Sequence, residues 1–131
     1  MNQDFARKII LLLIENLQKE EVERGLIGQY NNVRFENTDH KPGNFYWELS
    51  VSGIGEKVLP VATRIESLFF WERTQNIPID CIIRLQDGYM KSLEVYSADG
   101  AVFDHLCLDN IEIVEDDGWN HHCCCYVSGA Y

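Results

Sequence analysis

The sequence predicts an α+β fold in which an N-terminal helix packs against an antiparallel β-sheet. Two observations predict it. Apolar residues follow helical spacing near the N-terminus. After them come several short segments that are rich in β-branched and aromatic residues and are separated by turn signals. With 131 residues, 46% of them hydrophobic and 24% charged, the chain is long enough to bury one core. Because no linker or repeat divides it, we expect a single domain spanning residues 1–131.

The N-terminal helix is expected to begin at Asp4, as its cap, and to end at about Arg24. Over residues 5–17, apolar side chains recur three and four positions apart, and further apolar residues between them widen the buried surface. Gly25 and Gly28 are expected to end this helix, because glycine favours the backbone conformation that follows a helix C-terminus.

The middle of the chain predicts strands and a second helix. A short strand is expected at residues 33–36, and a half-buried strand at residues 45–51, where aromatic and aliphatic residues alternate with others. In residues 58–74 the apolar positions fit helical spacing after Pro60, so we expect a second, short helix. A strand is the alternative there, because the aromatic run at residues 69–71 would also suit one.

The second half of the chain indicates a β-meander. Residues 79–85 and 90–96 are rich in apolar residues and flank an Asp-Gly pair at 87–88, which is a strong signal for a hairpin turn. A second Asp-Gly pair follows at 99–100, and residues 111–115 supply a third strand. Three such strands need a cover over one face, and the N-terminal helix is expected to provide it.

The chain has a net charge of −10, and this charge is unevenly distributed. Residues 80–117 contain ten acids and two bases, a net charge of −8, whereas residues 1–79 contribute only −2. Such a concentration of negative charge favours a positively charged protein partner and argues against direct binding to nucleic acid. The alternative is a solvated acidic surface that only keeps the protein soluble.

We expect the partner to contact residues 104–119, where carboxylates lie close to aromatic residues. Aromatic anchors surrounded by charges of one sign are typical of protein interfaces, because the charges speed encounter and the desolvated rings hold the partner. The alternative is that the rings pack in the core. The predicted partner-binding residues are Asp104, Asp109, Glu112, Glu115, Asp116, Asp117 and Trp119.

The sequence contains no phosphate-binding or calcium-binding motif, and we expect a protein that is not an enzyme and needs no cofactor. The alternative is a metal-binding protein or enzyme that uses the His/Cys-rich residues 121–125. Adjacent residues of an extended chain point to opposite faces, which argues against a metal site and favours a terminal strand. His105 and Cys107 could pair as base and nucleophile, but a reactive thiolate needs an electropositive setting and these surroundings are acidic.

The chain is expected to be cytoplasmic and to make no contact with a membrane. Its longest strongly apolar run covers residues 9–14, far short of the roughly 20 residues that span a bilayer. Acidic residues follow this run where a signal peptide would have its cleavage site. Three of the five cysteines are consecutive, which is a poor disulfide framework, so we expect reduced thiols.

Residues 87–100, with the sequence Asp-Gly-Tyr-Met-Lys-Ser-Leu-Glu-Val-Tyr-Ser-Ala-Asp-Gly, resemble a segment of small bacterial immunity proteins. Such proteins are encoded beside polymorphic or contact-dependent toxins. The resemblance covers essentially one hairpin, a scaffold motif that carries no functional residues. It implies a small, acidic, cytoplasmic protein that neutralises a basic toxin domain, often a nuclease, by stoichiometric binding. An acidic adaptor or chaperone-like module of a secretion system is a further alternative.

Overall fold

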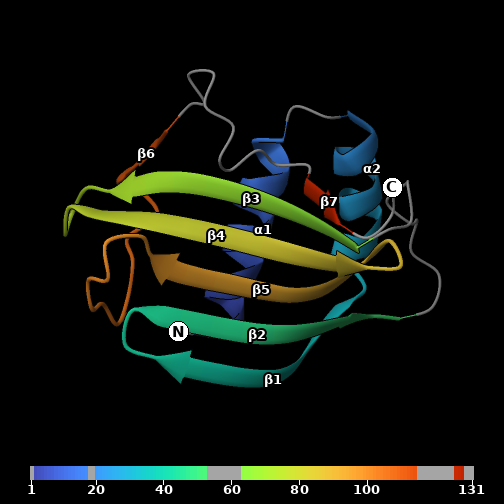
Figure 1. Ribbon diagram of the computed structural model, residues 1–131, viewed down its shortest axis with the longest axis horizontal. Coiled ribbons are helices and arrows are strands. Elements are labelled where there is room, and N and C mark those ends of the chain that lie inside the picture. Colours follow the sequence, from blue (N-terminus) through green and yellow to red (C-terminus); the bar gives the residue numbers. More distant parts are fainter. Residues whose placement is uncertain (1, 18–19, 53–62, 115–125, 129–131) are drawn as a thin grey trace.

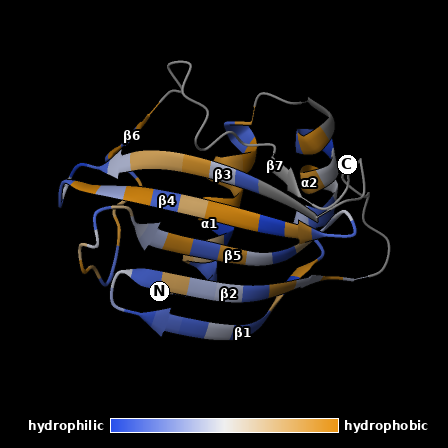
Figure 2. Cartoon of the chain, in the orientation of Figure 1, coloured by the Kyte–Doolittle hydropathy of each residue, from blue (hydrophilic) through white to orange (hydrophobic). Residues whose placement is uncertain are grey.

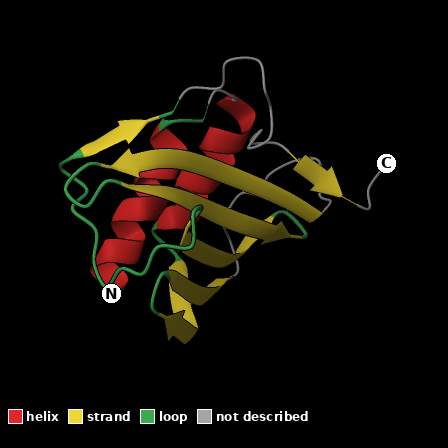
Figure 3. Cartoon of the chain, turned by 60° about the vertical axis from the view of Figure 1, so that its left-hand side comes forward, coloured by secondary structure: helices red, strands yellow, loops and turns green. Residues whose placement is uncertain are grey.

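The computed structural model describes residues 2–17, 20–52, 63–114 and 126–128. In this part of the chain, two helices lie on one face of an antiparallel sheet, so the predicted α+β class is confirmed (Figures 1 and 3). Both helices precede all of the strands. The elements are α1 (Gln3–Glu15), α2 (Glu20–Tyr30), β1 (Val33–Lys41), β2 (Asn44–Val51), β3 (Thr63–Glu72), β4 (Ile77–Gln86), β5 (Tyr89–Ser97), β6 (Ile111–Ile113) and β7 (Tyr126–Ser128).

α1 begins at a different cap and ends earlier than the sequence predicted. Asn2, rather than Asp4, is the N-cap, because its side-chain oxygen accepts a 2.9 Å hydrogen bond from the backbone N–H of Phe5. Asn16 is the C-cap, and its side-chain amide donates to the carbonyl oxygen of Leu12 at 2.8 Å. Asparagine competes for backbone hydrogen bonds and so favours helix ends, a signal that the prediction overlooked.

α2 contains both glycines that were predicted to end the first helix. Gly25 is buried, Gly28 is exposed, and the helix continues beyond them. The prediction of one long helix ending at about Arg24 was therefore wrong. Glycine costs a helix about 1 kcal/mol relative to alanine. The burial of Val22 and Leu26 in the core contributes about 1.5–3 kcal/mol each and offsets that cost.

β3 occupies most of residues 58–74, where a second helix was predicted, so that prediction was wrong and the alternative, a strand, is correct. The side chains of Leu68 and Phe70 are buried, whereas those of Phe69 and Trp71 lie on the other face and are half-buried. β3 pairs with β4 along nearly its whole length. That pairing overrides the local helical spacing, because strand preference depends mainly on packing against neighbouring strands.

The strands follow the order β1-β2-β5-β4-β3-β6 in the sheet, with β7 paired to β3, and these pairs are antiparallel. The predicted hairpin is confirmed: Asp87 and Gly88 join β4 to β5 with φ angles of 54° and 86°, as a type I′ turn requires. β3, β4 and β5 form a meander. The strand predicted at 111–115 is β6, and it pairs with β3 instead of β5, because β2 already occupies the second edge of β5.

β1 is longer than the predicted strand at residues 33–36, because its polar second half also pairs with β2 across a bulge between Phe35 and Thr38. Figure 2 shows that β1 is mostly hydrophilic, which is typical of an edge strand. The strand predicted at 45–51 is confirmed as β2. β7 follows directly on residues 121–125, for which a terminal strand was expected, and those residues lie outside the described part of the chain.

The core lies between the helices and the inner face of the sheet, which we define as the face toward α1 and α2 (Figures 1 and 3). α1 contacts β3 and β4, and α2 contacts β5. Along most of β2, β3 and β4 every second side chain is buried in this core, whereas β1 contributes mainly Val33. The largest fully buried side chains are Trp47, Phe70, Ile9, Ile10, Leu13, Ile14, Leu26, Leu49, Ile79, Ile83, Leu85 and Met90.

A buried glutamine fixes α2 to the β4–β5 turn. The side-chain amide of Gln29 donates to the carbonyl oxygen of Gly88 at 2.7 Å, and its oxygen accepts from the backbone N–H of Met90 at 2.9 Å. Leaving a buried backbone group without a partner costs about 1–3 kcal/mol. Gln29 therefore couples the orientation of the helix to the register of the hairpin.

Candidate functional site

The chain from β5 to β6 crosses one end of the sheet, at the left of Figure 1. Residues 98–112, which we call the acidic segment, comprise this crossing and the first two residues of β6. They contain four acidic residues and neither lysine nor arginine. The four carboxylates are exposed and belong to Asp99, Asp104, Asp109 and Glu112. The segment therefore presents negative charge without a lysine or arginine of its own to compensate it.

Two apolar side chains and a close backbone contact anchor the acidic segment. Phe103 and Leu106 are buried, and the ring of Phe103 lies 5.3 Å from that of Phe45 on β2, measured between centroids. The backbone N–H of Gly43, in the β1–β2 turn, donates to the carbonyl oxygen of Phe103 at 3.2 Å. Gly43 has a φ of 79°, and a Cβ atom there would lie 2.6 Å from the carbonyl oxygen of Ala101. Only glycine fits this approach.

A buried carboxylate ties the acidic segment to the β3–β4 turn. Glu72 accepts hydrogen bonds from the backbone N–H of Gln75 at 2.9 Å, from the Gln75 side-chain amide at 2.8 Å and from the backbone N–H of Cys107 at 3.1 Å. The same Gln75 amide donates to the carbonyl oxygen of His105 at 2.8 Å. Burial by itself raises the pKa of Glu72, but these hydrogen bonds outweigh it and lower the pKa below its ordinary value.

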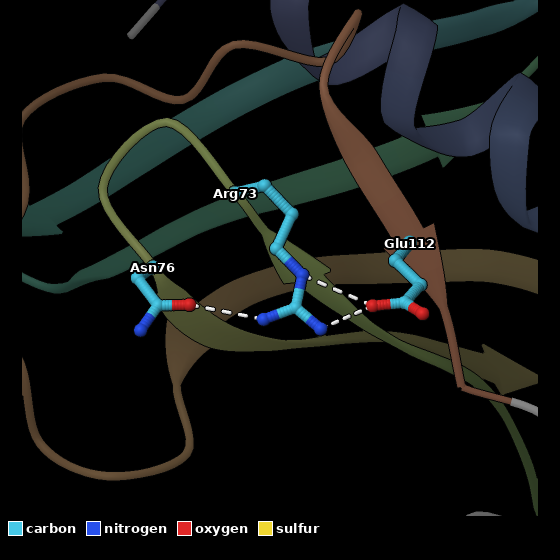
Figure 4. Close-up of polar contacts among 3 residues, drawn as sticks. All are labelled: Arg73, Asn76 and Glu112. Carbon is cyan, nitrogen blue, oxygen red and sulfur yellow. Dashed lines mark hydrogen bonds and ion pairs between the residues drawn. The ribbon is translucent and has the colours of Figure 1, made fainter.

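Arg73 compensates the charge of one of the four carboxylates (Figure 4). Its Nε and Nη2 atoms donate to Oε1 of Glu112, the first at 3.0 Å, and its Nη1 atom donates to Oδ1 of Asn76 at 3.0 Å. Its Cζ atom lies 5.1 Å from the centroid of the Trp71 ring. Glu112 therefore joins β6 to the β3–β4 turn, and its negative charge is partly neutralised.

The other carboxylates of the acidic segment differ in their surroundings. Asp99 accepts a 2.9 Å hydrogen bond from the backbone N–H of Ala101 and so shapes its own turn. Among the described residues, Asp104 and Asp109 take part in no ion pair. Between Asp99 and Asp104, the side chain of Val102 is 69% exposed. Sequence reasoning missed Val102, because exposure of a single valine has no local signal.

The structure thus brings three of the predicted partner-binding residues together at one end of the sheet. Asp104, Asp109 and Glu112 lie on the acidic segment, and Glu112 is bound to Arg73. The remaining predicted residues lie outside the described part of the chain, as does the predicted His/Cys-rich segment at 121–125. These remaining residues are Glu115, Asp116, Asp117 and Trp119.

The face of the sheet away from the helices is a second feature, and the sequence prediction did not identify it. We call it the outer face. Register and burial place aromatic and charged side chains on it, and all of them are half-buried. Its residues on the four central strands include Tyr46 and Glu48 on β2, Phe69 and Trp71 on β3, Asp80, Ile82 and Arg84 on β4, and Glu94 and Tyr96 on β5.

The polar groups of the outer face bind one another. The hydroxyl of Tyr96 donates to Oδ2 of Asp80 at 3.1 Å, and Nη1 of Arg84 lies 3.1 Å from Oε1 of Glu94. Burial, the charge of Asp80, the hydrogen bond to it and the charge of Glu94 together raise the pKa of Tyr96 to about 12, although the charge of Arg84 acts in the opposite direction. The hydroxyl of Tyr96 therefore lies in a negative electrostatic environment.

The described residues offer little for catalysis. They contain no group of three or more His, Cys, Asp or Glu side chains that could hold a metal ion. Cys81 is fully buried, and burial and the charge of Asp80 raise its pKa well above the ordinary value. Cys107 is half-buried and His105 is exposed, in a segment that forms no strand, so no strand places these two side chains on a common face.

A shallow hollow with a volume of about 210 Å³ lies beside α1, lined by Lys8, Leu11, Leu12, Glu15 and Leu108. The mainly apolar lining lacks the converging polar groups that orient a small molecule. Separately, neither α1 nor α2, nor any other helix in the described ranges, combines the length and the apolar character needed to cross a membrane.

The chain was compared with protein-family models, with curated proteins and with solved structures, and no match was found in any of the three comparisons.

Proposed function

We propose that this protein is an immunity protein, which neutralises a basic toxin domain, a nuclease, by stoichiometric binding without catalysis. The observation that supports the proposal most is the acidic segment. It presents four exposed carboxylates and neither lysine nor arginine, and a network of hydrogen bonds and buried side chains holds it against the end of the sheet.

Fixed carboxylates suit such a role for two reasons. A cluster of like charges attracts an oppositely charged partner over several ångströms and raises the association rate, an effect that salt weakens. A segment that is already ordered loses little conformational freedom on binding, which favours affinity. A nuclease binds the phosphate backbone through basic residues, so carboxylates at suitable positions would occupy the same groove or bind beside it.

Asp104 and Asp109 are the residues expected to contribute most to association, because Glu112 is already paired with Arg73 and Asp99 is engaged in its own turn. Val102, exposed between Asp99 and Asp104 in the sequence, would add an apolar contact to the charged surface.

The first experiment is a pull-down of the chain from its native cells at low and high salt, with identification of the bound protein by mass spectrometry. We expect one basic toxin domain, held tightly at low salt and less tightly at high salt. If no protein is held under either condition, the proposed function is wrong.

The second experiment measures association with the captured toxin for the double variant Asp104→Lys/Asp109→Lys. Its control is Glu23→Lys on α2, which lies away from the acidic segment and changes the net charge by half as much, so the slowing is compared per unit of charge changed. We expect the first variant to slow association by at least about tenfold, in line with the range of electrostatic steering, and the control to slow it much less. Equal slowing per unit of charge by both variants would mean that total charge, rather than the acidic segment, directs the encounter.

A further inference from the structure

We infer that the outer face of the sheet binds arginine side chains of the partner protein, and so forms a guanidinium-binding surface next to the acidic segment. The inference rests on the proposed function, because it needs a basic protein partner. The observation behind it is the interleaving of aromatic rings and carboxylates on neighbouring strands, at positions fixed by the strand register.

Two rows of paired residues define this surface. In the first, Phe69, Asp80 and Tyr96 lie opposite one another on β3, β4 and β5, so a carboxylate stands between two rings. In the second row, Ile82, Glu94 and Tyr46 lie on β4, β5 and β2. Neighbouring strands are about 4.8 Å apart, so a planar guanidinium can contact a ring and the adjacent carboxylate at the same time.

Charge makes the outer face suitable for cations. Its nine residues named above contain three carboxylates, of Glu48, Asp80 and Glu94, and one guanidinium, of Arg84. A negative surface with aromatic rings attracts cations through both the carboxylates and the negative faces of the rings. It repels nucleic acid, and a second copy of this chain with its net charge of −10 is disfavoured for the same reason.

The chain's own arginines show this mode of binding at the border of the outer face. The guanidinium of Arg73 lies over the ring of Trp71 while it binds the carboxylate of Glu112 (Figure 4). Arg84, on the face itself, pairs with Glu94. Both arrangements combine a planar cation with groups that the rest of the face also offers, and arginine suits them better than lysine because its flat group stacks and donates several hydrogen bonds at once.

The position of the surface also fits a single partner. β5 carries Glu94 and Tyr96 and leads directly into the acidic segment. The first residue of that segment, Ala98, is bound to the start of β4, because its backbone N–H donates to the carbonyl oxygen of Pro78 at 2.8 Å. In the views of Figures 1 and 3, the two helices lie behind the sheet and leave its outer face uncovered by helix. A basic partner that meets the acidic segment can therefore extend along the outer face.

The test is an NMR titration of the full chain with two probes, nona-arginine and nona-lysine, which carry equal charge. The background is the Asp104→Lys/Asp109→Lys variant, which removes much of the acidic segment's attraction. We expect nona-arginine to bind more tightly than nona-lysine and to shift the signals of Tyr46, Ile82 and Tyr96. Equal binding of the two probes, or shifts confined to the acidic segment, would overturn the inference.

Two further variants locate the effect. Tyr46→Ser with Glu48→Gln is expected to weaken nona-arginine binding about tenfold, because it removes a ring and a carboxylate that a guanidinium would contact together, and to change nona-lysine binding much less. Tyr96→Phe keeps the ring and is expected to retain the preference for arginine. If the first variant does not fold, Tyr96→Ser takes its place and is expected to lose the preference for nona-arginine. A preference that the tested variant leaves unchanged would overturn the inference.

The two proposals can fail separately. If a toxin is captured and the reversal of Asp104 and Asp109 slows association, but the probes show no preference for arginine, the proposed function stands and the outer-face inference is wrong. If arginine is preferred and no toxin is captured, the proposed function is wrong and the guanidinium-binding surface remains.

Discussion

The two faces of the sheet are built from alternate residues of the same strands, and they differ in what they can do. On β3, Phe70 is fully buried against the helices, whereas its neighbours Phe69 and Trp71 lie half-buried on the outer face. On β4, Ile79 and Cys81 are fully buried, while Asp80 between them faces outward. The inner face therefore supplies most of the burial that stabilises the fold, whereas the outer face carries half-buried aromatic and charged groups.

The largest expected effect on stability comes from removing one aromatic side chain of the inner face. Phe70→Ala is expected to lower the free energy of unfolding by about 3–5 kcal/mol, because it removes a fully buried ring and leaves a cavity. Its matched control, Trp71→Ala, is expected to cost clearly less, because that ring is half-buried. Urea denaturation of both variants measures the difference. Equal costs would mean that the outer face is as tightly packed as the inner one.

The next effect concerns the contact that holds the acidic segment at the end of the sheet. Gly43→Ala is expected to lower the free energy of unfolding by about 2–3 kcal/mol, since alanine disfavours the positive φ angle and its Cβ would meet the carbonyl oxygen of Ala101. Gly100→Ala is the control: its φ angle is also 79°, but no atom lies within 4 Å of a Cβ there. We expect about 1–2 kcal/mol for the control. Thermal unfolding of both variants measures these losses of stability. Equal losses would contradict the close approach of Gly43 to the carbonyl oxygen of Ala101.

The smallest effect is a pH dependence of stability that originates at Glu72. Its hydrogen bonds lower the pKa below the ordinary value of 4.5, so the ionised carboxylate stabilises the folded state at higher pH. This contribution is complete above about pH 4.5 and is lost as the pH falls through the lowered pKa. We expect Glu72→Gln to be less stable than the unmodified protein at pH 7, and the difference to narrow at acidic pH. Urea denaturation at pH 7, 4.5 and 3 measures it, and a constant difference would contradict the role of Glu72.

The predictions from sequence were best where the signal is local. The hairpin at Asp87 and Gly88 was correct because a type I′ turn needs positive φ angles at two adjacent positions, and this pair supplies them. The strand at 45–51 was correct because alternation with a period of two is visible within a few residues. Helix ends were predicted less well, because the burial of Val22 and Leu26 outweighs the helix-breaking tendency of the glycines in α2.

The candidate site was predicted in part. The concentration of acidic residues was evident from the sequence, and the structure places Asp104, Asp109 and Glu112 at one end of the sheet. The pairing of Glu112 with Arg73 was not predictable, since the two residues are brought together only when β6 pairs with β3. The outer face was missed because residues 58–74 were assigned to a helix, and in a helix Phe69 and Trp71 do not share a face.

The sequence by itself determined the α+β class, the β4–β5 hairpin and the acidic character of the segment after it, because periodicity, turn chemistry and charge are properties of short stretches of chain. Only the tertiary structure decided that β6 joins the sheet beside β3, that Glu72 and Gly43 hold the acidic segment, and that rings and carboxylates from four strands share one face. These arrangements depend on which strands become neighbours and in what register, and that is settled by packing between residues far apart in the chain.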